Sequence, residues 1–193
     1  MLPLDDLAEW RQIVSIPKPE SWDWKTLARG ELANYDPSKV MVYFSEQGCF
    51  DRLTTLMGFE DACIAMMTEP ELCYEIFGAI ADYKIELIRC VKKHLNPDVF
   101  MYTDDIAEAT GLVISPDVYR ELLKPHQARI IRAIKDCAMI AEQHTCGNCS
   151  AVLEDYVELG VDVFFPAQAC NDIPAVKRKF GRKLVICGGF VSQ

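Results

Sequence analysis

His144 and Cys146 are the residues of this sequence whose types and spacing point most directly to chemistry. They lie two positions apart, directly after a predicted strand. At a strand end, an imidazole nitrogen and a thiolate can turn toward the same space and bind Zn²⁺, which prefers nitrogen and sulfur ligands in tetrahedral geometry. Cys149 would extend the pattern to HxCxxC, and Cys187 on the last predicted strand could reach the ion through space. In the alternative interpretation, His144 is a hydrogen-bonded histidine at the sheet edge, the cysteines are core thiols, and Cys149 lies in the next helix.

Two adjacent carboxylates, Asp104 and Asp105, follow another predicted strand. One of them could act as a catalytic acid or base with a raised pKa, or orient a metal-bound histidine through a hydrogen bond. Because adjacent residues of a strand face opposite ways, we expect only one of the two to face the site. The alternative is that both are solvated acids that cap the next segment. Glu46 and Gln168 also follow strands and are candidates for substrate binding.

The candidate site residues follow short apolar segments, which alternate along the sequence with longer amphipathic segments. The predicted strands cover residues 39–45, 98–103, 138–143, 161–165 and 183–187. The predicted helices cover residues 69–95, 115–137, 150–159 and 172–181. Pro125 lies inside the second helix and should kink it. Strands that alternate with helices predict βα units around a parallel sheet, with the chemistry at the carboxyl ends of the strands.

The first 37 residues differ from the rest of the chain. They hold four of the ten prolines and all three tryptophans without a sustained period, which predicts an irregular arm anchored by aromatic packing. Residues 38–193 form the α/β domain. No glycine-rich dinucleotide motif or P-loop favours a doubly wound sheet over a (β/α)8 barrel. A barrel needs eight strands and about 250 residues, so five strands predict an incomplete TIM-type barrel.

Composition excludes several classes of protein. Half of the residues are hydrophobic and a quarter are charged, as in ordinary globular domains. The sequence has no signal peptide and no apolar run of the roughly 18 residues that a membrane span needs, so we expect a soluble, cytoplasmic protein with no membrane partner. The net charge of −9 disfavours nucleic acid as a partner. The nine cysteines are odd in number and scattered, which predicts reduced thiols rather than a disulfide framework.

Several motifs in fixed order resemble the uroporphyrinogen decarboxylase superfamily. They include Thr103-Asp-Asp-Ile, Gly111-Leu-Val-Ile-Ser-Pro116, His144-Thr-Cys-Gly-Asn148, Pro166-Ala-Gln168 and Ile186-Cys-Gly-Gly189. The likeness is close over about residues 98–190 and loose over about 38–97. The fold of the superfamily is a (β/α)8 barrel, so the resemblance implies further strands before residue 38 and after residue 190. Their absence from the sequence indicates a fragment of a larger protein or a chain that pairs with another copy.

The resemblance implies one of two enzymatic branches. In zinc-dependent methyltransferases, a methyl group moves between a corrinoid protein and a thiol or folate-type acceptor. His144 and Cys146 would then be zinc ligands, and the third ligand, a cysteine, normally comes far downstream, about where this sequence ends; Cys187 is a candidate only from its place on the last predicted strand. In the decarboxylases, which convert uroporphyrinogen to coproporphyrinogen without metal or cofactor, an Asp would stabilise a protonated ring. That branch carries an arginine-rich N-terminal loop, whereas residues 1–40 contain only Arg11 and Arg29.

The leading hypothesis is therefore a methyltransferase-like enzyme with Zn²⁺ and with a corrinoid on the substrate side. Asp104 or Asp105 would tune the site or handle a proton, and the partners would be a small methyl acceptor and a corrinoid protein. The second hypothesis is a cofactor-free decarboxylase acting on a tetrapyrrole. The third is a catalytically silent partial barrel that acts as a binding partner. In each case we expect a homo-oligomer or part of a longer chain, because an incomplete sheet has open edges.

Overall fold

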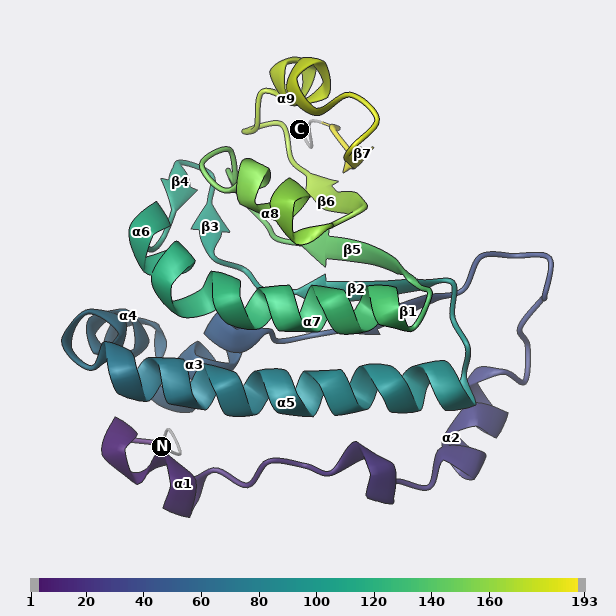
Figure 1. Ribbon diagram of the computed structural model, residues 1–193, viewed down its shortest axis with the longest axis horizontal. Coiled ribbons are helices and arrows are strands. Elements are labelled where there is room, and N and C mark those ends of the chain that lie inside the picture. The colour runs from purple at the N-terminus through teal and green to yellow at the C-terminus, as the bar shows by residue number, and fades with distance from the viewer. Residues whose placement is uncertain (1–3, 191–193) are drawn as a thin grey trace.

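The structure of the protein is a computed structural model that describes residues 4–190, built around a five-stranded parallel sheet (Figure 1). The strands are β1 (Val42–Ser45), β2 (Val99–Thr103), β5 (Ile140–His144), β6 (Val163–Ala167) and β7 (Val185–Gly188). A separate two-stranded hairpin consists of β3 (Ala107–Glu108) and β4 (Gly111–Leu112). The longer helices are α2 (Trp24–Glu31), α3 (Cys49–Met57), α4 (Phe59–Thr68), α5 (Pro70–His94), α7 (Lys124–Asp136), α8 (Leu153–Leu159) and α9 (Ile173–Phe180). Two shorter helices are α1 (Trp10–Ile13) and α6 (Pro116–Val118).

The order of the strands in the sheet identifies the architecture. The order is β1-β2-β5-β6-β7, so each strand pairs with the next large strand along the chain and every pair is parallel. A doubly wound sheet reverses its order at a switch point, whereas a (β/α) barrel proceeds in one direction. The described residues therefore form an open five-stranded arc of a barrel, and the predicted α/β fold is confirmed.

The two faces of the sheet have different surroundings. Phe100, Tyr102 and Phe164 point to the face that the helices cover, and all three are fully buried. Several apolar strand residues of the opposite face are exposed, because in the described chain no helix or second sheet covers it. The clearest examples are Val42, Phe44, Ile140 and Val185, with exposed fractions of 46%, 47%, 44% and 53%. In a closed barrel this face is the interior, where such side chains pack against one another.

We expect the 193-residue chain to associate in solution through this open sheet. An apolar face and two unpaired strand edges together favour contact with another copy. Light scattering at micromolar concentration should therefore report a mass well above 21.8 kDa, the mass of one chain. A compact species of 21.8 kDa would contradict this prediction.

Three segments differ from the sequence-based expectation. Helices α3 and α4 fill residues 49–68, where no helix was predicted. The arm contains the two-turn helix α2, whose first turn is capped by the Asp23 carboxylate accepting a hydrogen bond from Thr26 N. Pro125 does lie in a helix, and a π-helical segment at Tyr119–Leu123 precedes it. A wider turn relieves the clash and the missing hydrogen bond that a proline causes inside a helix.

The structure also bears on the cysteines and on membrane spans. All nine cysteines are free, as the sequence indicates. Between residues 4 and 190, no helix has the length and apolar character needed to cross a membrane.

Candidate metal centre at the carboxyl edge of the sheet

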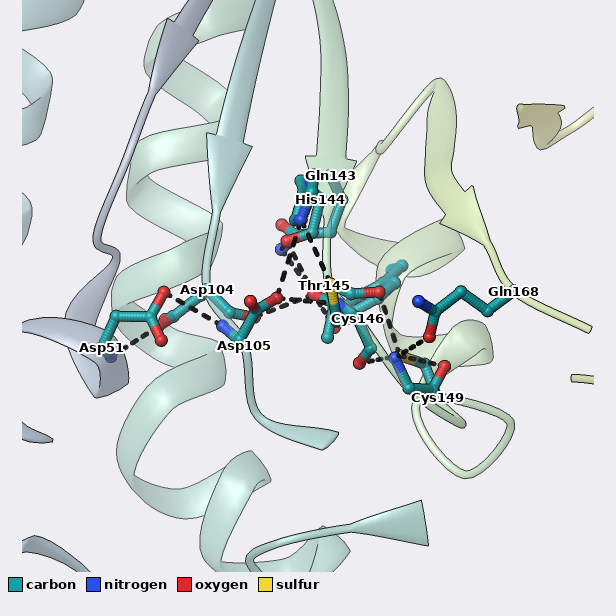
Figure 2. Close-up of polar contacts among 11 residues, drawn as sticks. Asp51, Asp104, Asp105, Gln143, His144, Thr145, Cys146, Cys149 and Gln168 are labelled. Atoms are coloured by element: carbon teal, nitrogen blue, oxygen red, sulfur yellow. Dashed lines mark hydrogen bonds and ion pairs between the residues drawn. The ribbon is translucent and has the colours of Figure 1, made fainter. Parts of the chain in front are cut away.

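Three side chains converge where strands β2 and β5 end (Figure 2). Oxygen, nitrogen and sulfur atoms of Asp105, His144 and Cys146 all lie within 4.8 Å of one another. Cys146 Sγ is 3.5 Å from His144 Nε2, which in turn is 3.8 Å from Asp105 Oδ1. The cluster is only partly exposed to solvent, so its atoms can meet a ligand that enters from the open side of the sheet.

Strand register explains why these residues meet. Thr103 of β2 pairs with His144 of β5, so Asp105 and Cys146 each lie two residues beyond a paired position. The loop after β5 is then fixed by backbone contacts: Thr145 N donates to Phe165 O, and Thr145 Oγ1 donates to Asp104 O. Cys146 N donates to Asp105 Oδ1 over 2.7 Å, which holds the carboxylate beside the thiol.

The donor set fits a zinc ion. Tetrahedral Zn²⁺ holds its ligands at about 2.0–2.3 Å, which places ligand atoms about 3.3–3.8 Å apart. The Sγ–Nε2 separation of 3.5 Å lies in this range, the Nε2–Oδ1 separation of 3.8 Å lies at its upper end, and all three ligand atoms are within 4.8 Å of one another. Small side-chain movements would therefore bring them to ligand distances. Imidazole nitrogen, thiolate sulfur and carboxylate oxygen are all usual zinc ligands, and three protein ligands leave a fourth position for a substrate atom, as in catalytic sites.

Burial sets the protonation of the two strongest donors. Burial lowers the pKa of His144 by more than the charge of Asp105 raises it. The imidazole is therefore neutral at pH 7, and its nitrogen lone pair is free. Burial raises the pKa of Cys146, and the Asp105 carboxylate raises it further. The thiol is therefore protonated at pH 7 unless a cation displaces its proton.

Aromatic rings from two further strands flank the imidazole. Phe165 of β6 lies edge-on to His144 with 5.3 Å between ring centroids, and Phe44 of β1 lies at 6.1 Å. These rings restrict the orientation of His144 and keep water from one side of it.

The loop that carries Cys146 depends on a glycine. Gly147 has φ +86°, and a Cβ at this position would lie 2.6 Å from the backbone of Ala107 and Glu108 in the hairpin. Gly147 N donates to Gln168 Oε1 over 2.7 Å, so the Gln168 side chain supports the loop. The role of Gln168 in substrate binding stays a prediction. In this structure its side-chain oxygen already accepts the hydrogen bond from Gly147 N. Cys149 is fully buried, and its thiol contacts backbone carbonyls of the same loop instead of the cluster.

Asp104 faces away from the cluster, as expected for one of two adjacent strand-end residues. Its carboxylate accepts hydrogen bonds from Cys49 N, Asp51 N and Tyr102 Oη, each about 3.0 Å long. It therefore caps the first turn of α3. Burial, and then the charge of Asp51, raise the pKa of Asp104 to about 7. A raised pKa was expected for one carboxylate at this edge, but the contacts of Asp104 are those of a structural cap.

Two other predicted site residues lie apart from the cluster. Cys187 is exposed on β7, and β6 separates this strand from β5. Cys187 is not a member of the group of side chains whose ligand atoms lie within 4.8 Å of one another, and Asp105 is. The role of Cys187 as third ligand stays a prediction. The Glu46 side chain is exposed, and its backbone carbonyl accepts a hydrogen bond from Lys84.

Two features of the site do not follow from the sequence predictions. The sequence predicts Asp105 as an acid, a base or an orienting group, and not as a member of the ligand cluster, although the pairing of β2 with β5 could have suggested it. Asp51 is not predicted at all, and its carboxylate accepts a hydrogen bond from Asp105 N over 3.1 Å. No local signal in the sequence marks Asp51, because its partner is 54 residues away.

Among solved structures, a methyltransferase from Methanosarcina mazei superposes with a TM-score of 0.68 at 16% sequence identity, over 81% of this chain and 44% of that one. The chain thus spans less than half of that protein, and the likeness concerns the fold. No curated protein sequence matches the chain. The family model for uroporphyrinogen decarboxylase (URO-D) matches residues 33–192, most of the chain. The chain therefore belongs to the uroporphyrinogen decarboxylase family.

Proposed function

We propose that the chain carries the zinc-binding part of a methyltransferase site that activates a thiol acceptor for attack on a corrinoid-bound methyl group. The observation that carries the proposal is the convergence of His144 Nε2, Cys146 Sγ and Asp105 Oδ1. The similarity in fold to the Methanosarcina methyltransferase supports the proposal of a methyltransferase site.

Each protein group has a defined part in this function. His144 offers a neutral nitrogen, and Phe165 fixes the plane of its ring. Asp105 holds the loop through Cys146 N and adds a negative charge that favours a bound cation. A zinc ion held by these residues would lower the pKa of an acceptor thiol, so that the nucleophilic thiolate would form at neutral pH.

The decarboxylase hypothesis has no comparable support. It needs a free carboxylate to stabilise a protonated ring, whereas both oxygens of Asp104 are bound by α3 and Tyr102. Asp105 instead lies beside the imidazole of His144 and the thiol of Cys146.

Cobalt substitution tests the proposed function without the rest of the barrel. Protein loaded with Co²⁺ should show thiolate-to-metal charge-transfer absorption from Cys146, and a small thiol such as mercaptoethanol should increase it as a second thiolate binds. His144→Ala should abolish both signals. If the metal binds but added thiol leaves the spectrum unchanged, the thiol-activating role is wrong while the metal site stands.

A further inference from the structure

A cavity of about 260 Å³ lies between the N-terminal arm and helices α3 and α5. Its walls are largely apolar, and they include Ile13, Val14, Ile16, Leu56, Ile76 and Ile80. The volume is a little below the roughly 300–1,000 Å³ of typical small-molecule pockets, so the cavity suits a small ligand. None of its lining residues belongs to the metal cluster.

Two cationic side chains, Arg52 and Lys84, line this apolar cavity. Lys84 is only 2% exposed, and its Nζ donates hydrogen bonds to Ser45 Oγ over 2.9 Å and to Glu46 O over 2.6 Å. An ammonium group has three N–H donors, so one remains for another acceptor. Arg52 lies on α3, close enough for its charge to act on Lys84.

Neither cation forms an ion pair in the described part of the chain, although the charges of Asp104 and Asp51 act on Lys84 from a longer distance. The ion pairs found between residues 4 and 190 include neither Arg52 nor Lys84. A buried charge is costly unless it is paired, and here two like charges lie near each other. Burial, and then the charge of Arg52, lower the pKa of Lys84 to about 8. An anion in the cavity would relieve this cost.

We propose that the cavity binds a small monocarboxylate with an apolar tail. The planar guanidinium of Arg52 matches the two oxygens of a carboxylate, and Lys84 offers its remaining N–H. The tail would lie against Leu56, Ile76 and Ile80. A tail without a charge would leave both cations unpaired, and a small inorganic anion would leave the apolar walls uncovered. The proposal does not depend on the metal site.

Octanoate is the probe, and isothermal titration calorimetry of the full chain at neutral pH is the measurement. We expect saturable, one-to-one binding with a dissociation constant below about 1 mM. Octanol has a tail of the same length without the carboxylate, and it should bind at least about tenfold more weakly. Equal binding of the two compounds, or no binding of octanoate, would overturn the proposal.

Three variants assign the binding to this cavity. Arg52→Gln should weaken octanoate binding by about tenfold to a hundredfold, because it removes a charge-assisted pair of hydrogen bonds. Leu56→Trp should abolish binding by filling the cavity without changing its charge. Arg89→Gln is the matched control, since Arg89 is an exposed arginine of α5 that lines a different pocket. Circular dichroism confirms that each variant is folded. If folded Arg52→Gln and Leu56→Trp both bind octanoate as Arg89→Gln does, the cavity is not the site.

Discussion

Cys146→Ser should remove tight zinc binding from this protein, whereas Cys149→Ser should leave it in place. Cys146 Sγ lies 3.5 Å from His144 Nε2, while Cys149 is fully buried and directs its thiol to backbone carbonyls. Loss of a partner outside the coordination sphere costs about 10–100-fold in metal affinity. Loss of a thiolate ligand should therefore cost more than about a hundredfold.

The measurement is competition of each zinc-loaded variant with a chelator of known affinity. Cys149→Ser is a matched control because both variants exchange one thiol for a hydroxyl within the same loop. If zinc is lost from Cys149→Ser and retained by Cys146→Ser, the ligand assignment is wrong. The affinity of the unaltered protein should also rise with pH. The pKa of Cys146 is raised, so the thiol carries a proton at neutral pH that zinc must displace, and each step to higher pH makes this easier.

The sheet was predictable because its strands are nearly continuous apolar segments. A strand covered on both faces in a closed barrel needs apolar residues at successive positions, as in Val99-Phe-Met-Tyr102. The carboxyl ends of the strands were therefore also predictable, which placed His144 and Asp105 at the same edge. The alternation of side chains along a strand then separated Asp105 from Asp104, although the sequence does not say which of the two faces the helices.

The sequence contains less information about α3. Apolar residues recur along it with helical spacing, since Phe50, Leu53 and Met57 are all buried. The local start signal is missing, however, because Gly48 stands at the N-cap and has no side chain to accept a hydrogen bond. The acceptor is supplied by Asp104 from another part of the chain.

Spacing in the sequence does not show that Asp105 belongs to the cluster, because this follows from the order of the strands. Cys187 has a suitable residue type, but its strand β7 is separated from β5 by β6. Asp105 follows β2, the direct neighbour of β5, and so its carboxylate lies beside the imidazole.

Asp104→Ala should destabilise the protein by about 3–5 kcal/mol. The carboxylate satisfies two buried or partly buried backbone N–H groups, of Cys49 and Asp51, and the buried hydroxyl of Tyr102. An unsatisfied buried donor costs about 1–3 kcal/mol. Removal of Asp104 leaves Asp51 N and the Tyr102 hydroxyl without this acceptor, while Cys49 N keeps its hydrogen bond to Tyr102 Oη. Position 48 cannot supply a replacement acceptor, because it is a glycine packed so closely that a Cβ there would overlap Asp104 and Tyr102.

Urea unfolding in the presence of a chelator measures this loss, and Asp105→Ala is the matched control. Asp105 is the adjacent residue and more exposed, and its side chain accepts one backbone hydrogen bond, from Cys146 N. We expect it to cost about 1 kcal/mol, the usual value for a single hydrogen bond. Equal losses from the two variants would show that the cap on α3 has no special importance.

The pH dependence of stability gives an independent measure of the same group. The pKa of Asp104 is raised to about 7 in the folded protein, against about 3.9 in an unfolded chain. Between these values the folded state holds a proton that the unfolded state has released. The contribution of Asp104 to the free energy of unfolding is therefore fully present below about pH 4 and is lost as the pH rises to 7. Asp104→Asn cannot ionise and keeps one acceptor oxygen, so its stability should change less over this interval. If the two curves are parallel from pH 4 to 7, Asp104 titrates normally, and its three hydrogen bonds outweigh the cost of its burial.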